Sequence, residues 1–189
     1  VEVTILELSQ LYASLANGGD AYPLALTLDD AAPRPGHLLM SEEAACITLS
    51  MLAENPRPYR SGPLRRADQL ADESTAVAWK TGTSWAFRDA WSVGLFGHYL
   101  IAVWVGNFDG SGNPALVGST AAAPLLFRIV DQINATRSST GNTKTIEQTP
   151  SFLLRGSRQH DLNVKKVSVC SASGDLPNQF CPKTKDTWF

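Results

Sequence analysis

Apolar residues recur at helical spacing in three segments of the chain. The first segment begins at a Thr-x-x-Glu signature, Thr4 with Glu7, and is followed by the glycine pair Gly18-Gly19, which favours a helix end. The second begins at Ser41, ahead of two glutamates, and ends at Asn55-Pro56. The third runs from Ala122 to Asn134 with one apolar side. The pattern therefore predicts three amphipathic helices.

Runs of β-branched, aromatic and small residues predict strands. An apolar run from Thr75 to Trp79 suits a buried strand, which runs straight into Lys80-Thr81-Gly82-Thr83. Two further strands, 90–96 and 99–105, flank the tight turn at 97–98. Three consecutive strands with short connections imply an antiparallel meander, with the third helix packed across it. The expected fold class is α/β, in the α+β sense of an antiparallel sheet flanked by helices.

Apolar residues almost vanish after the third helix. Serine, threonine, asparagine and glycine dominate from Ala135 to Thr149, which is typical of a linker. Short apolar runs at 152–154 and 164–169 then predict strands. We therefore expect a main domain, a linker and the start of a small β-rich domain, at residues 1–137, 138–150 and 151–189.

Charge and cysteine content exclude several classes of protein. A formal net charge of −2 over 189 residues gives no electrostatic footprint for nucleic acid. Cys46 lies in an apolar helical stretch and is expected to be a buried free thiol. Cys170 and Cys181 close a short polar loop with no nearby Cys or His partner, so we expect a disulfide in an oxidising compartment and no metal site.

The string after Trp79 carries candidate chemistry. Lys80 supplies a positive charge, Thr81 and Thr83 supply hydroxyl groups, and Gly82 allows another backbone to approach closely. These residues describe a docking edge for an anionic substrate. The alternative for the bare Lys-Thr-Gly triplet is a solvated lysine at a strand end, followed by a turn glycine.

A wider resemblance favours the first interpretation. Lys-Thr-Gly is one of three motifs shared by penicillin-binding proteins and class A β-lactamases. The string 78–84, with 87–91 and Gly94, resembles the transpeptidase domain of class A penicillin-binding proteins, most closely the 1C type. The first helix is similar to the one that follows the Ser-x-Asn triplet of that domain. The Cys170–Cys181 segment resembles the start of the small C-terminal domain of 1C-type enzymes.

The resemblance implies acyl transfer by a serine-type D,D-transpeptidase. A serine attacks the D-alanyl carbonyl of a peptidoglycan stem peptide, D-alanine leaves, and the acyl group passes to an amine of a neighbouring stem. β-Lactam antibiotics acylate the same serine. No cofactor is implied.

The resemblance also assigns roles to residues of the string. Lys80 would be catalytic, attracting the substrate carboxylate and assisting proton movement, and the backbone N–H of Thr83 would be an oxyanion donor. Thr81, Gly82, Thr83 and Ser84 would bind substrate. We expect Lys80 to line a groove beside the sheet, with Thr83 offering its hydroxyl and N–H to the same space. Strict pleating would instead put Thr81 and Thr83 on the face opposite Lys80.

The other two motifs of the family are missing. The chain contains no Ser-x-x-Lys, and its Ser111-Gly112-Asn113 follows Lys-Thr-Gly in a predicted loop, so we treat that match as chance. The expected partners are peptidoglycan stem peptides, β-lactams and an upstream segment of the same protein that supplies the nucleophile. That segment would also carry a glycosyltransferase domain and the anchor in the inner membrane. The chain would then be periplasmic, and inactive on its own.

Two other functions stay open on sequence grounds. One is a fragment of a serine β-lactamase or D,D-carboxypeptidase, against which stand the 1C-like string around Lys80 and the cysteine-containing segment. The other is a non-catalytic periplasmic binding module. Penicillin labelling would separate the enzymes from the binding module, and rapid clearance of the acyl-enzyme would identify a hydrolase.

Overall fold

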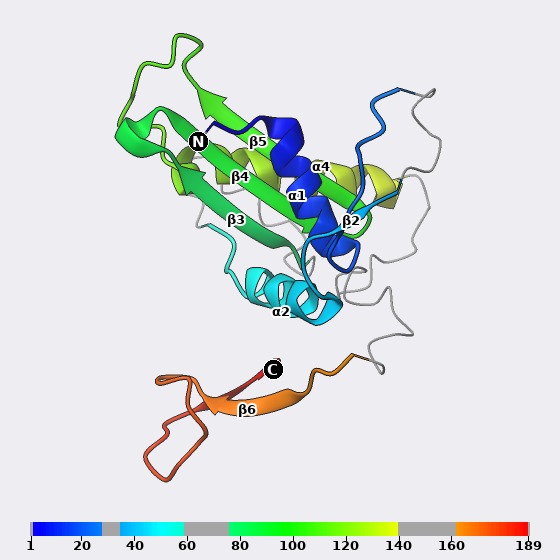
Figure 1. The fold of residues 1–189 in the computed structure, drawn as a ribbon. Coiled ribbons are helices and arrows are strands. Elements are labelled where there is room, and N and C mark those ends of the chain that lie inside the picture. The colour runs from blue at the N-terminus through cyan, green and yellow to red at the C-terminus, as the bar shows by residue number, and fades with distance from the viewer. Residues whose placement is uncertain (1, 28–34, 59–75, 140–161, 189) are drawn as a thin grey trace.

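The computed structural model describes residues 2–27, 35–58, 76–139 and 162–188 (Figure 1). The helices are α1 (Ile5–Ala16), α2 (Glu42–Ala53) and α4 (Ala123–Ser139), with short helical turns η2 (Trp85–Phe87) and η3 (Gly118–Ala122). The strands are β1 (Asp20–Ala21), β2 (His37–Leu38), β3 (Ala78–Thr83), β4 (Asp89–Phe96), β5 (Tyr99–Gly106), β6 (Lys166–Cys170) and β7 (Thr184–Trp188). This mixed arrangement of antiparallel sheets and helices confirms the predicted fold class.

The central sheet has the order β3-β4-β5, with both neighbouring pairs antiparallel. Lys80 lies opposite Val93, and Gly82 lies opposite Trp91. Among the described strands β3 pairs only with β4, so one backbone edge of β3 is left outside the ladder. The Lys-Thr-Gly-Thr string lies within β3, in continuity with Trp79, as expected for a strand that runs into the string.

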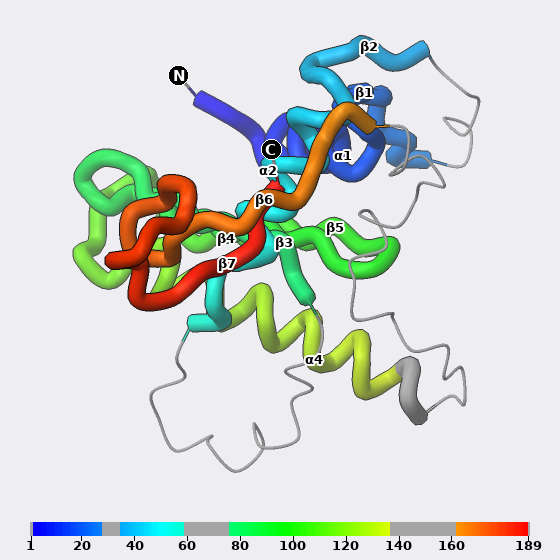
Figure 2. The backbone as a smooth tube through the Cα atoms, turned by 90° about the horizontal axis from the view of Figure 1, so that it is seen from below, coloured from blue at the N-terminus to red at the C-terminus, as the bar shows by residue number. Residues whose placement is uncertain are grey.

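Helices cover both faces of this sheet. Figure 1 shows α1 crossing the front of the sheet with α4 behind it, and the view in Figure 2 again separates the two helices by the strands. On the α4 face, Trp79 and Phe96 pack with Leu126, Phe127 and Val130. On the other face a smaller core contains Leu15 of α1, Ala45 and Leu49 of α2, Ala78 of β3 and Leu95 of β4. Burial of these apolar surfaces holds the layers together.

Local sequence signals set the helix ends. The Thr4 hydroxyl accepts from the Glu7 N–H, and the Glu7 carboxylate accepts from the Thr4 N–H, which is the predicted capping box. The chain leaves α1 through Gly18 and Gly19, whose φ angles are +71° and +96°. Ser41 caps α2 by accepting from the N–H of Ala44. Both caps were predicted from the sequence.

The third helix differs from its prediction. A π-helical turn, Gly118–Ala122, precedes it, and α4 continues to Ser139, past the predicted end at Asn134 and into the interval assigned to a linker. The predicted strand at 152–154 and most of the predicted linker lie outside the described residues.

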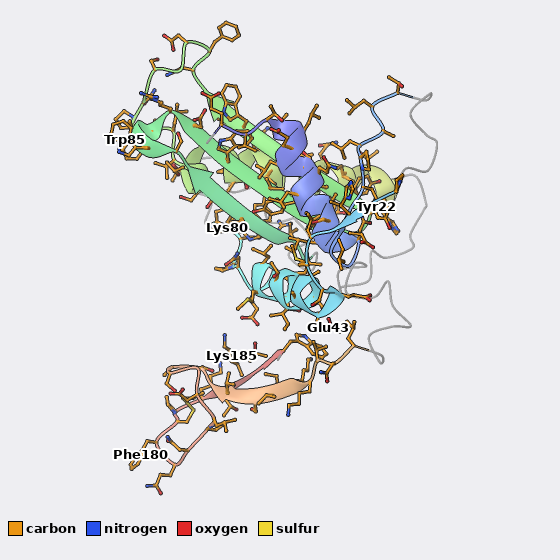
Figure 3. All side chains as sticks on the ribbon, in the orientation of Figure 1. Tyr22, Glu43, Lys80, Trp85, Phe180 and Lys185 are labelled. Atoms are coloured by element: carbon orange, nitrogen blue, oxygen red, sulfur yellow. A yellow bond between two sulfur atoms is a disulfide. The ribbon has the colours of Figure 1, made fainter. Side chains whose placement is uncertain are left out.

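The C-terminal segment forms the hairpin β6–β7. Cys170 and Cys181 are disulfide-bonded across it, with their Cα atoms 5.7 Å apart, and Cys46 is a buried free cysteine, as predicted. The hairpin lies beside α2, and the Lys185 ammonium is 3.3 Å from the Glu54 carboxylate (Figure 3). No helix in the described part of the chain is long and apolar enough to span a bilayer.

Candidate functional site

A groove of about 220 Å³ lies between α1, with the residues just before it, and the strands β3 and β4. Lys80 lines it, in the position that the sequence predicted, and Figure 3 marks this residue on β3. The remaining lining residues are mostly apolar: Val3, Leu8, Tyr12, Thr81, Gly82, Trp91 and Val93. The site therefore combines one cation with a largely apolar wall.

The Lys80 side chain is exposed and bonded to its own strand. Its ammonium donates to the carbonyl oxygen of Thr81 at 2.7 Å. This contact holds the charge beside the outer edge of β3. A carboxylate that entered the groove would meet an ammonium with further donors available, since the group has three N–H bonds.

Thr83 does not share the groove with Lys80. Its hydroxyl oxygen accepts from the backbone N–H of Gly118 at 2.9 Å, and Thr83 is not among the groove-lining residues. Gly118 belongs to η3, which packs on the α4 face of the sheet beside Thr81. The prediction that the Thr83 hydroxyl faces the same groove as Lys80 is therefore wrong. The pleat of β3 places Lys80 towards α1 and the Thr83 hydroxyl towards η3.

Ser84 closes the turn that follows β3. Its hydroxyl accepts from the N–H of Asp89 at 2.8 Å, and its own N–H donates to the Asp89 carbonyl at 3.0 Å. Ser84 is not among the residues that line the groove. The structure thus gives this residue a turn-forming position.

The turn between β3 and β4 has unusual backbone geometry. Ala86 and Phe87 have φ angles of +59° and +53°, a region that side-chain-bearing residues rarely adopt. The Phe87 carbonyl accepts from the Asn113 N–H at 2.9 Å, which ties the turn to the loop after β5. The Arg88 guanidinium lies 6.0 Å from the Trp85 ring. Strained backbone of this kind is found near functional sites.

The capping box positions the α1 side of the groove. Val3 and Leu8 flank Thr4 and Glu7, so the same turn that begins the helix presents the groove wall. Hydrogen bonds from the Thr4 backbone and hydroxyl lower the pKa of the Glu7 carboxyl. Tyr12 also lines the groove, and burial raises the pKa of its hydroxyl.

One residue that supports β3 was not identified from the sequence. Asn55 bonds Trp79, the residue before Lys80, through both its side chain and its carbonyl. The sequence marks Asn55 only as the helix-ending residue before Pro56. No local pattern connects it with a strand 24 positions later.

Comparison with known proteins identifies relatives along most of the chain. It is 33% identical over 150 residues to penicillin-binding protein 1C of Escherichia coli (strain K12), which covers 79% of this chain and 18% of that protein. It is 30% identical over 138 residues to penicillin-binding protein 1B of Haemophilus influenzae, which covers 68% of this chain and 17% of that protein. The chain thus spans less than a fifth of the length of these relatives. No family model matches the chain.

A solved structure shares the fold. The crystal structure of penicillin-binding protein 1A from Haemophilus influenzae superposes with a TM-score of 0.62 at 17% sequence identity. The match covers 98% of this chain and 32% of the other. The antiparallel sheet with its flanking helices is therefore an arrangement already observed in a solved protein.

Proposed function

Because the chain is homologous to class A penicillin-binding proteins over most of its length, we propose that it is part of a peptidoglycan D,D-transpeptidase. In this proposal the chain contributes the Lys-Thr-Gly strand of the active site. The observation that carries the proposal is the position of Lys80, on an edge strand and lining a groove beside the sheet. The 1C type is our assignment of the family member.

The proposed reaction is acyl transfer through a serine ester. The serine oxygen attacks the penultimate D-alanyl carbonyl of a stem peptide, the amide bond breaks, and D-alanine leaves with the serine's proton. An amine of a second stem peptide then attacks the ester, forms a new amide and returns the serine as an alcohol. β-Lactams form the same ester by opening their ring.

Lys80 would provide the positive field for this reaction. The terminal carboxylate of the substrate would take the ammonium donor that now bonds the Thr81 carbonyl, or one of its two neighbours. Thr81 and Gly82 would line the bound chain, and the backbone N–H of Thr83 would donate to the oxyanion. Loss of an oxyanion donor costs about 10²- to 10³-fold in rate.

The nucleophile would come from an upstream segment of the same protein, since the chain contains no Ser-x-x-Lys. We assign residues 1–137 to the C-terminal half of the transpeptidase domain and 151–189 to the start of a small β-rich domain, joined by a linker at 138–150. The upstream segment would also anchor the protein in the inner membrane, with this chain in the periplasm.

The test is penicillin acylation of the full-length protein with Lys80→Ala. We expect the second-order rate constant for labelling by a fluorescent penicillin to fall at least about tenfold, the lower range for a positioned proton-transfer group. Lys165→Ala, which removes an exposed lysine ahead of β6, is the matched control and should label normally. Normal labelling of Lys80→Ala would overturn the proposal, and so would a wild-type protein that never labels.

A further inference from the structure

Trp79 is held from two directions by one residue. The Asn55 side-chain N–H donates to the Trp79 carbonyl at 2.8 Å, and the Trp79 indole N–H donates to the Asn55 carbonyl at 3.1 Å. The two bonds fix both the backbone and the ring of Trp79 against the segment that follows α2. Lys80 is the next residue along the strand.

The Trp79 ring also makes an aromatic contact. It meets the Phe127 ring edge to face, with centroids 5.1 Å apart and an interplanar angle of 85°. The guanidinium of Arg57 lies 4.7 Å from the same Phe127 ring and bonds Asp131 of α4 at 2.9 Å. Asn55 and Arg57 therefore join the end of α2 to both β3 and α4. Because Trp79 is buried in this arrangement, its ring has little freedom to shift.

The Asn55 side chain satisfies one backbone carbonyl, that of Trp79, on the unpaired edge of β3 next to the groove. Carbonyls two residues apart on a strand project to the same edge, so those of Trp79 and Thr81 both face away from β4 or both towards it. Each accepts a side-chain donor from outside the ladder, Asn55 and Lys80 respectively, which places them on the outer edge. At the far end, Gly118 holds the Thr83 hydroxyl. The strand is thus fixed on both sides of Lys80-Thr81-Gly82.

We propose that Asn55 is a positioning residue for Lys80. By fixing the Trp79 carbonyl it sets where the following backbone runs, and hence how far the ammonium reaches along the edge of β3. The inference rests on the proposed acyl-transfer function, because it concerns the placement of that reaction's cation. Asn55 itself is not among the groove-lining residues, so in this proposal it acts through Trp79 and not by touching substrate.

The test uses Asn55→Leu in the full-length protein. This change removes the side-chain donor and keeps the backbone carbonyl and a similar volume. Misplacement of a reacting group by about 1 Å can cost about 10²-fold, so we expect the rate constant for fluorescent-penicillin acylation to fall about fivefold or more. Asn107→Leu is the matched control, because Asn107 likewise donates its side-chain N–H to a backbone carbonyl, that of Ser111 at 2.8 Å, in a loop after β5. It should acylate normally.

A second pair of variants separates positioning from a general structural effect. In the Lys80→Ala background, Asn55→Leu should lower acylation by less than about twofold, because the group that Asn55 positions is gone. A full additional loss in that background would overturn the inference, as would normal acylation of Asn55→Leu alone. If Lys80→Ala itself acylates normally, the proposed function fails instead, so the two failures are distinguishable.

Trp79→Phe is a second variant of the Asn55–Trp79 pair, and its melting temperature shows whether the pair is needed for folding. This variant removes the indole N–H that bonds the Asn55 carbonyl and keeps a ring against Phe127. It should lower acylation in the same direction while its melting temperature stays within a few degrees of wild type. If Asn55→Leu and Trp79→Phe both fail to fold, the Asn55–Trp79 pair is a stability element and the positioning role is rejected.

Discussion

The backbone N–H of Gly118 donates a 2.9 Å hydrogen bond to the hydroxyl oxygen of Thr83, on the face of the sheet opposite the one to which the pleat directs Lys80. Thr83 is held by η3 on the α4 side, whereas Lys80 lines the groove on the α1 side. A substrate in that groove would therefore meet the ammonium of Lys80 and the backbone edge of β3. The Thr83 hydroxyl, by contrast, ties the end of β3 to η3.

Gly118 is expected to tolerate no side chain. A Cβ at this position would lie 2.8 Å from the Trp91 carbonyl oxygen and 3.0 Å from the Thr81 Cβ, both of which belong to the central sheet. Gly118→Ala should therefore lower the free energy of unfolding by about 1–3 kcal/mol, the range for overpacking a close contact. Thermal or urea unfolding would measure this change. Ser119→Ala, an exposed position in the same turn, is the control, and equal stabilities of the two variants would contradict the prediction.

The stability contributed by the α1 capping box should depend on pH. Hydrogen bonds from Thr4 lower the pKa of Glu7 below its ordinary value of 4.5 in the folded chain. A carboxyl whose folded pKa is lowered stabilises the fold above its unfolded pKa, and that stability is lost as the pH falls through the folded pKa. Glu7→Gln should therefore melt below wild type at pH 7, and the difference should shrink towards pH 3.

Removal of the hydroxyl donor of Thr4 provides the control for this pH effect. Thr4→Ala removes the hydroxyl donor and keeps the backbone N–H, which is the larger cause of the lowered pKa. The pKa of Glu7 should therefore rise only part of the way towards 4.5, which an NMR titration of the Glu7 carboxyl would follow. A difference between wild type and Glu7→Gln that is the same at both pH values would show that the carboxylate charge plays no part.

The ends of the elements were the features that the sequence predicted well. The helix ends were predicted from Thr4 with Glu7, from the Gly18-Gly19 pair and from Ser41. Each acts on backbone groups within a few residues, so the sequence alone indicates where the helix begins or ends. The hairpin disulfide was predicted for the same reason, since its two cysteines lie 11 residues apart. The two β-strands that flank the 97–98 turn were also placed to within one residue.

Contacts between residues far apart in the sequence could not be predicted in this way. Pleating of the strand separated Lys80 from Thr81 and Thr83, but the sequence did not show which element packs on each face. The Gly118–Thr83 and Asn55–Trp79 bonds join residues 35 and 24 positions apart. Such pairs depend on how helices pack on the sheet, and hydrophobic periodicity does not encode the partners.

Loss of the disulfide should loosen the C-terminal hairpin and leave the central sheet unchanged. In the double variant Cys170→Ser with Cys181→Ser, the unfolded hairpin regains the freedom that the closed loop removed, a cost of about 2–3 kcal/mol on a chain-entropy estimate. Amide hydrogen exchange should therefore accelerate in β6 and β7 and stay constant in β3, β4 and β5. Cys46→Ala, which removes the buried free thiol, is the control and should leave hairpin exchange unchanged. Equal acceleration in both sheets would contradict a local role.

The last prediction concerns the serine that penicillin would acylate in the proposed reaction. An acyl-enzyme of this kind needs a hydroxyl beside a proton-accepting group. The groove that holds Lys80 has no serine among its described lining residues, and the chain contains no Ser-x-x-Lys. Ser111, the serine of the chance Ser-x-Asn match, accepts through its hydroxyl from Asn107 at 3.1 Å within a loop. The acylated serine should therefore lie outside residues 1–189.

Peptide mapping of the labelled full-length protein by mass spectrometry checks this expectation. The penicilloyl adduct should appear on a peptide from the upstream segment, and Ser111→Ala should leave its yield unchanged. Lys80→Ala should lower the yield on that same upstream peptide, because in the proposed reaction the cation would act on a serine supplied by another part of the protein. An adduct on any serine of this chain would contradict the division of the site between the two segments.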